Sequence, residues 1–131
     1  MDATTSQQDS TTNTLNKPDP IVQYIALRSD LKWPKGALIA QSCHATAAVL
    51  HLNYNDKQTQ EYLENLDSMH KVVVGVPSEN ELKELSEQLA KDDIKFKLWI
   101  EQPENVPTCL ATKPYSKSLV EKFFKAFKLL R

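Results

Sequence analysis

Short apolar runs, separated by polar and turn-forming stretches, predict four β-strands along the chain. Residues 21–27 are rich in Ile, Val, Tyr and Leu, and residues 72–76 form a continuous apolar run typical of a strand covered on both faces. Residues 94–100 largely alternate between apolar and polar positions, which predicts an edge strand with one wetter face. Residues 108–112 predict a last short strand, which Pro114 ends.

Helical spacing and capping residues predict four helices around these strands. The first runs from Pro34 to about residue 52, and the second covers roughly residues 58–66. Ser78, with Glu81 three positions later, forms the pattern of a capping box that starts the third helix. Ser116 is predicted to cap a terminal helix whose buried face carries Val120, Phe123, Phe124 and Phe127.

The order of these elements (strand, helix, helix, strand, helix, strand, strand, helix) predicts an α/β fold. Long crossovers through helices favour parallel neighbouring strands with helices on both faces of the sheet. The loop at residues 101–107 is too short for a crossover, so one of the last two strands is expected to be antiparallel. We therefore expect a three-layer α/β/α domain with a four-stranded mixed sheet over residues 21–131. Residues 1–20 are almost entirely polar and are predicted to be a disordered tail.

Composition excludes several classes of protein. With 40% hydrophobic and 25% charged residues the chain is typical of a globular protein, and it lacks the run of roughly 20 apolar residues that spans a bilayer. The start of the chain resembles neither a secretory signal nor a transit peptide, which predicts a cytoplasmic location without membrane contact. Cys43 and Cys109 have no metal-site spacing and are expected to be buried free thiols. We predict no metal, and the two glycines leave no glycine-rich loop for a nucleotide cofactor.

Charge is unevenly distributed although the net charge is only −1. Residues 113–131 contain six lysine or arginine residues and one glutamate, whereas residues 54–93 contain ten acids and four lysines. Such a positive end attracts phosphates. The alternative interpretation is a solvated helix face with no ligand.

Residues 28–45, the segment after the first strand, have the sequence RSDLKWPKGALIAQSCHA. Lys35 lies at a predicted helix N-terminus, where its charge adds to that of free backbone N–H groups and makes an anion site. The helix is rich in Gly and Ala, so its backbone can approach a sheet closely. An exposed lysine and a tightly packed core helix are the alternative interpretations.

This segment resembles the signature of type-2 peptidyl-tRNA hydrolases, with Arg-x-Asp-Leu, Lys-Gly and Ala-Gln-x-x-His-Ala at matching spacing. Lys71 before the second strand is a further match, and residues 70–73 and 99–105 resemble the domain-containing branch of the family. The resemblance implies cleavage of the ester between a peptide and its tRNA, without a cofactor, and implies tRNA or peptidyl-tRNA as partner. A homodimer is left open.

The resemblance also assigns roles to residues. Lys35 would stabilise the oxyanion or hold a tRNA phosphate, while Gln41 and His44 would orient water or Lys35. A structural hydrogen bond is an equally good alternative for His44. Thr108 matches a threonine that opens the last strand, and Arg28 and Asp30 are expected to shape the first turn as an ion pair. The lysines predicted to contact RNA are Lys71, Lys113, Lys117, Lys122 and Lys125.

Two departures from the family pattern affect the expected activity. Ala37 replaces the second lysine of Lys-Gly-Lys, and the family's Gln-Asp-Ala-Gly loop is replaced by the shorter segment 101–107. Glu101 or Glu104 could substitute for the missing acid. The alternative to an active hydrolase is therefore a catalytically weak or inactive member that serves as an RNA- or protein-binding module.

Overall fold

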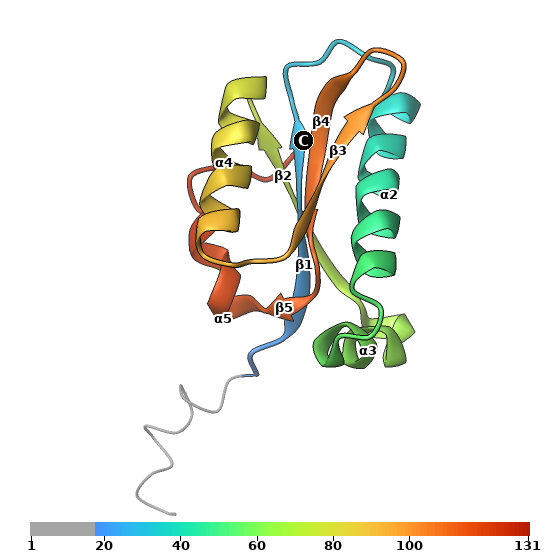
Figure 1. The fold of residues 1–131 in the computed structure, drawn as a ribbon, viewed down its shortest axis with the longest axis vertical. Helices are drawn as coiled ribbons and strands as arrows, with labels where there is room; N and C mark the ends of the chain where they lie inside the picture. Colours follow the sequence, from blue (N-terminus) through green and yellow to red (C-terminus); the bar gives the residue numbers. More distant parts are fainter. Residues whose placement is uncertain (1–17) are drawn as a thin grey trace, which may run out of the picture.

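A computed structural model describes residues 18–131, which form three layers with a mixed sheet between two layers of helices (Figure 1). Strands β1 (Ile21–Arg28), β2 (His70–Val76), β3 (Phe96–Glu101) and β4 (Val106–Thr112) lie in the order β2-β1-β4-β3. The two-residue strand β5 (Tyr115–Ser116) pairs with the start of β1. Helices α2 (Lys35–Leu52) and α3 (Lys57–Glu64) lie on one side, and α4 (Glu79–Lys91) and α5 (Lys117–Val120) on the other. The predicted α/β/α architecture is confirmed.

Strand directions agree with the lengths of the connections. β1 and β2 are parallel and are joined through α2 and α3, whereas β4 runs antiparallel to both β1 and β3. The predicted edge position of residues 94–100 is confirmed because β3 is the last strand on its side. The added feature is β5, which is too short to be detected from an apolar pattern.

Two apolar clusters, one on each face of the sheet, form the core. The larger cluster lies on the α4 side and joins Val74 and Val76 of β2 to the buried face of α4, Leu82, Leu85 and Leu89. The smaller cluster lies beneath α2, where Ala45 and Val49 contact Ile25, Leu27, Cys109 and Ala111. The alanine at position 45 lets the α2 backbone sit close to β1 and β4, so side chains near the start of α2 are held firmly over the sheet.

The predicted helix starts differ in how well they agree with the structure. Ser78 and Glu81 form the predicted capping box: the Glu81 N–H donates to Ser78 Oγ at 3.1 Å, and Ser78 Oγ lies 3.0 Å from Glu81 Oε2. Ser116 makes no side-chain cap for α5. Instead Asp19 accepts hydrogen bonds from the backbone and the hydroxyl of Ser118, at 3.0 and 2.6 Å. Asp19 belongs to the predicted tail of residues 1–20, of which residues 1–17 lie outside the described residues.

The prediction of a long terminal helix is wrong. After the four residues of α5 and a 3-10 turn at Glu121–Phe123, the chain leaves the helical path and runs along β2. Gly75 N–H donates to the Lys128 carbonyl at 2.9 Å, and Leu130 N–H donates to the Val73 carbonyl at 3.0 Å. Residues 126–131, here called the C-terminal segment, thus cover the outer edge of β2. The predicted burial is nevertheless found, because Val120, Phe123 and Phe124 are buried and Phe127 packs against them.

Candidate active site

Five of the sequence-predicted site residues lie at one end of the sheet: Arg28, Asp30, Lys35, Gln41 and Thr108. This end contains the carboxyl ends of β1, β2 and β3, the start of β4 and the N-terminus of α2 (Figure 1). The turn after β1 and the β3–β4 turn approach each other there. Loops at the carboxyl ends of strands are the usual place for ligand sites in α/β folds.

Lys35 is the first residue of α2 and is exposed to solvent. The residue before it, Pro34, offers no side-chain cap, and its carbonyl accepts the Leu38 N–H at 3.1 Å. A β-carbon added at Gly36 would meet no heavy atom within 4 Å, so the space over the first turn is open. Uncapped N–H groups, the positive end of the helix dipole and the Lys35 charge together favour an anion at this position.

A cleft of about 750 Å³ opens beside Lys35 and is here called the α2 cleft. Its walls come from α2, the end of β1 and the turn after it, the middle of β2, and the C-terminal segment. The apolar side chains that line it are Leu27, Trp33, Leu38, Ile39, Val73 and Leu130. A mainly apolar hollow with a few polar groups at its rim is typical of small-ligand sites, and its volume lies within their usual range.

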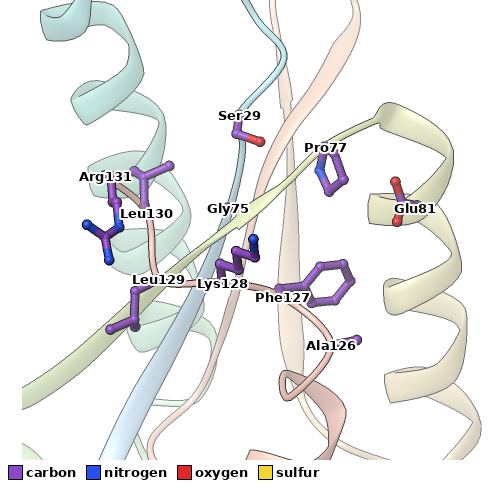
Figure 2. Close-up of a pocket in the computed structure, with 10 residues that line it drawn as sticks. All are labelled: Ser29, Gly75, Pro77, Glu81, Ala126, Phe127, Lys128, Leu129, Leu130 and Arg131. Carbon is purple, nitrogen blue, oxygen red and sulfur yellow. The ribbon is translucent and has the colours of Figure 1, made fainter.

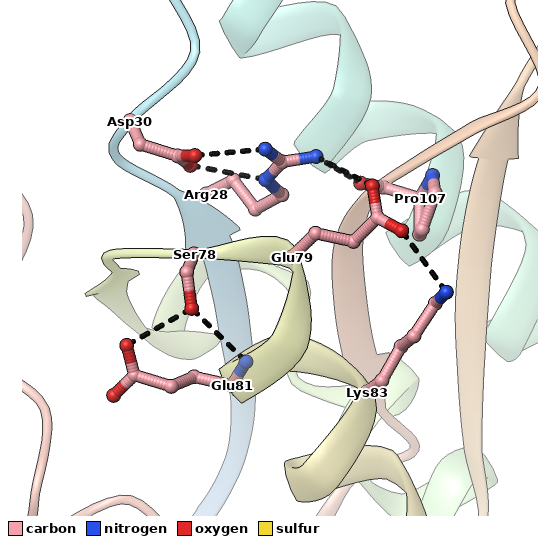
Figure 3. Close-up of polar contacts among 7 residues, drawn as sticks. All are labelled: Arg28, Asp30, Ser78, Glu79, Glu81, Lys83 and Pro107. Carbon is pink, nitrogen blue, oxygen red and sulfur yellow. Dashed lines mark hydrogen bonds and ion pairs between the residues drawn. The ribbon is translucent and has the colours of Figure 1, made fainter.

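Arg28 ties this end of the sheet together (Figure 3). Its guanidinium donates to both oxygens of Asp30, at 3.0 and 2.8 Å, and to the Pro107 carbonyl at 3.1 Å. Glu79 at the start of α4 lies 3.5 Å away and in turn pairs with Lys83 at 2.9 Å. The hydrogen bonds from Arg28 hold the pKa of the Asp30 carboxyl below its usual value, so this carboxylate is an ionised structural partner.

A second polar cluster lies on the other side of α2, over β3 and β4. The buried Thr108 hydroxyl donates to Gln41 Oε1 at 2.8 Å, and Gln41 Nε2 donates to the Ala37 carbonyl at 3.2 Å. Trp99 Nε1 donates to Glu101 Oε1 at 2.9 Å, and this hydrogen bond lowers the pKa of Glu101. Smaller lowering contributions come from the Gln41 amide and from His44. The His44 ring stacks on Trp99 with ring centroids 4.7 Å apart.

His44 and Lys35 do not converge. Nine residues along a helix correspond to a rotation of about 180° and a rise of about 13.5 Å, so the two side chains leave α2 on opposite faces. The stacking of His44 on Trp99 agrees with this direction. Gln41 is likewise directed to Thr108 in β4. The geometry does not favour the part of the prediction in which Gln41 and His44 orient Lys35, whereas their orienting a water molecule stays a prediction.

Two of the lysines predicted to contact RNA have polar partners within the protein: Lys113, which is buried, and Lys71, which stays partly accessible to solvent. The Lys113 ammonium is buried, 3.0 Å from Asp56 and 2.8 Å from the Pro114 carbonyl. Lys71 contacts Gln23 Oε1 at 2.6 Å and Tyr62 OH at 3.3 Å, and burial lowers its pKa. Lys113 in particular offers no free charge to a phosphate in this arrangement.

The other three lysines predicted to contact RNA lie in or beside α5, at the end of the sheet opposite Lys35 (Figure 1). Lys122 and Lys125 are exposed, and Lys117 is partly exposed. The structure therefore does not bring these lysines together with the α2 cleft.

The two cysteines differ in environment. Cys109 is fully buried, which raises the pKa of its thiol to about 12, whereas Cys43 is exposed on the outer side of α2. The prediction of a buried Cys43 is wrong because its position faces away from the sheet. Within residues 18–131 no three His, Cys, Asp or Glu side chains gather to hold a metal ion. No helix in this part of the chain is both long and apolar enough to span a bilayer.

Comparison with known proteins identifies the family. The family model described as peptidyl-tRNA hydrolase PTH2 matches residues 21–130. The human protein named "Putative peptidyl-tRNA hydrolase PTRHD1" is 46% identical over 120 residues, covering 88% of this chain and 86% of its own length, and the mouse protein of that name gives the same values. A peptidyl-tRNA hydrolase from Methanothermobacter thermautotrophicus is 33% identical over 113 residues, covering 82% and 98%.

The chain belongs to the PTH2 family. The family and the archaeal proteins named peptidyl-tRNA hydrolase place this PTH2 member among the hydrolases. A solved structure of a protein of unknown function from Agrobacterium tumefaciens has the same fold, with a TM-score of 0.60 at 12% identity, covering 88% of this chain and all of that chain.

Two features of this PTH2 member were not predicted from its sequence. The α2 cleft depends on Leu130, which reaches Val73 only because the chain leaves the helical path after residue 123. Trp99, which carries the Glu101 hydrogen bond and the His44 stack, occupies a polar position of the alternating pattern in β3. A large aromatic residue at a polar position of the strand was the feature of the sequence that could have indicated this contact with α2.

Proposed function

We propose that this protein hydrolyses the ester of N-acyl-aminoacyl-tRNA, releasing peptide or N-acyl amino acid and tRNA. The observation that carries the proposal is the uncapped N-terminus of α2, with exposed Lys35 at the rim of the α2 cleft. In an ester hydrolysis, negative charge develops on the carbonyl oxygen, and donors already in place at that point lower the barrier. Membership of the PTH2 family supports the same reaction.

In the proposed reaction, water attacks the ester carbonyl carbon and the oxyanion forms against the first turn of α2. Lys35 and the free N–H groups of this turn stabilise that oxyanion. The bond from the carbonyl carbon to the ribose oxygen then breaks, and a proton of the attacking water passes to that oxygen, which leaves as a hydroxyl. Arg28 acts at a distance, by fixing the β1 turn against Pro107 at the start of β4.

Of the two glutamates that could replace the family's acid, Glu101 of the second polar cluster is proposed in preference to Glu104. The hydrogen bond from Trp99 holds the Glu101 carboxylate in place and lowers its pKa. Glu104 lies exposed in the turn between β3 and β4. Thr108 and Gln41 are proposed to position the first turn of α2. Both side chains are almost fully buried, and they are hydrogen-bonded to each other behind this turn.

Single-turnover cleavage of N-acetyl-aminoacyl-tRNA by the wild-type protein and by Lys35→Ala tests the proposal. We expect cleavage by the wild type and at least a tenfold slower rate in the variant, which corresponds to about 1.4 kcal/mol of transition-state stabilisation. Lys32→Ala is the matched control, since Lys32 is an exposed lysine in the same turn and does not line the α2 cleft. Equal rates for wild type and Lys35→Ala would contradict the role given to Lys35.

A non-catalytic binding module is the second candidate function, and it is favoured by Ala37 and by the short segment at residues 101–107. Wild-type protein that binds tRNA but cleaves no faster than buffer would support it. The lysines of the α5 region add a separate prediction: tRNA affinity falls steeply with salt, and Lys122→Ala with Lys125→Ala reduces the slope. An unchanged slope would remove these lysines from the RNA surface.

A further inference from the structure

The α2 cleft combines mainly apolar walls with Lys35 at its rim. Its volume is about 750 Å³, and it opens directly beside Lys35. A second hollow of about 340 Å³ lies on the other side of the C-terminal segment, between that segment and α4 (Figure 2). Lys35 does not line this second hollow. A group attached to a carbonyl at the α2 N-terminus therefore lies beside the α2 cleft and not beside the second hollow.

The C-terminal segment completes the outer wall of the α2 cleft. Figure 2 shows Leu130 and Arg131 on the α2 side of the segment, whereas Phe127 lies toward α4. Gly75 permits this approach, because a β-carbon at that position would lie only 3.3 Å from Leu130 Cδ1. The main-chain hydrogen bond from Leu130 to Val73 fixes the wall in position.

The charged side chains that line the cleft are all cationic. They are Arg28, Lys35 and Arg131, and the lining contains no Asp or Glu side chain. Arg28 is already paired with Asp30, while Lys35 and Arg131 form no ion pair within the described residues. A cationic side chain entering the cleft would meet repulsion and lose hydration, whereas an apolar one would gain contact.

We propose that the α2 cleft receives the side chain of the amino acid that is esterified to the tRNA, and that it selects large apolar residues over small or cationic ones. This inference rests on the proposed function, since the ester carbonyl is placed at the N-terminus of α2. Ile39 and Leu130 provide apolar contact, and Lys35 and Arg131 exclude positive charge. Ile39 is a specificity-determining residue on this account.

The test compares N-acetyl-phenylalanyl, N-acetyl-glycyl and N-acetyl-lysyl esters carried on the same tRNA, so that only the aminoacyl group differs. The wild type is expected to cleave the phenylalanyl ester about 10- to 100-fold faster in kcat/KM than the other two, the range that burial of one large apolar side chain provides. Ile39→Glu places a carboxylate in the cleft and is expected to raise the lysyl rate relative to the phenylalanyl rate at least tenfold.

The variants are chosen to fold. Ile39 is 57% exposed, so glutamate at this position leaves the core unchanged, and Leu52→Glu is the matched control on an exposed residue of α2 outside the cleft. Similar rates for the three esters, or an equal effect of the two glutamate variants, would overturn the inference while leaving the proposed function standing.

A binding measurement separates the two failures. If no ester is cleaved, the proposed function fails, and the cleft is then tested with the non-hydrolysable amides of 3′-amino-3′-deoxyadenosine that carry N-acetyl-phenylalanine or N-acetyl-lysine. Tighter binding of the phenylalanyl amide, reversed by Ile39→Glu and not by Leu52→Glu, supports the cleft as the side-chain site. Equal binding of the two amides overturns it.

Discussion

The buried hydrogen bond between Thr108 and Gln41 allows a direct test of how the start of β4 is held against α2. Thr108 is fully buried and Gln41 is 2% exposed, and the hydroxyl donates to Gln41 Oε1 at 2.8 Å. Thr108→Val keeps the shape of the side chain and removes the donor. The amide oxygen of Gln41 then stays buried without a partner, which costs about 1–3 kcal/mol.

Taking about 2 kcal/mol as the central value, Thr108→Val should lower the melting temperature by about 8 °C for a domain of this size. Gln41→Leu should cost a similar free energy, because it removes the acceptor. In the double variant both polar groups are absent, so its free energy of unfolding should resemble that of either single variant, with a coupling energy of about 1–2 kcal/mol.

Urea unfolding followed by tryptophan fluorescence measures these free energies, with Trp99 close to the site. Thr112→Val in a cycle with Gln41→Leu is the matched control, because Thr112 is also buried in β4 but accepts a hydrogen bond from the Tyr24 N–H. A Thr108–Gln41 coupling no larger than the control, within about 0.5 kcal/mol, would refute the reasoning.

Two further predictions concern charged groups. Trp99→Phe removes the hydrogen bond that lowers the pKa of Glu101, so that pKa should rise toward its ordinary value; carboxyl NMR titration measures it, and an unchanged pKa would contradict the assignment. A carboxylate whose pKa is lower in the folded state than in the unfolded state stabilises the fold when it is ionised, and this stabilisation is lost as the pH falls through the folded-state pKa. With a smaller pKa shift, the free energy of unfolding of the variant should vary less between about pH 5 and 3 than that of the wild type. Asp56→Asn keeps the cap on α3 but removes the counter-ion of buried Lys113, which should lower the free energy of unfolding by about 1–3 kcal/mol at neutral pH, since Lys113 keeps its contact with the Pro114 carbonyl. Urea unfolding measures this loss, and adding Lys113→Met should recover part of it. An unchanged free energy of unfolding in Asp56→Asn would show that the pair is not formed.

Most of the fold was accessible from the sequence because local pattern and tertiary position agree. The capping box at Ser78 and the alternation in β3 each have a local cause, and each was found where it was predicted. The end of the chain was mispredicted because its conformation has a distant cause. The spacing of Phe123, Phe124 and Phe127 fits a helix, but pairing of Leu130 with Val73 draws the chain away from helical geometry.

The candidate site was harder to predict from the sequence, because it depends on the face of α2 from which each side chain projects. The sequence placed Lys35, Gln41 and His44 on one helix, and simple helix geometry separates Lys35 from His44 by about 180°. The sequence alone could not show which of these faces lies over β1 and β2 and which over β4. Likewise the sequence shows that Lys113 is charged, but not that it pairs with Asp56. That pair forms because the start of α3 packs near the end of β4.

The order of the strands has a consequence for the chain while it is being synthesised. β1 and β2 can pair as soon as residue 76 is synthesised. The other edge of β1 stays unpaired until β4 is synthesised, and the outer edge of β2 stays unpaired until residues 128–130 are synthesised. During that interval two strand edges are open to other nascent or unfolded chains. Residues 128–130, which cover the β2 edge, also supply Leu130 to the α2 cleft. A chain truncated before residue 128 therefore lacks both the cover on the β2 edge and one wall of the cleft. The edge is covered and the cleft completed by the same residues.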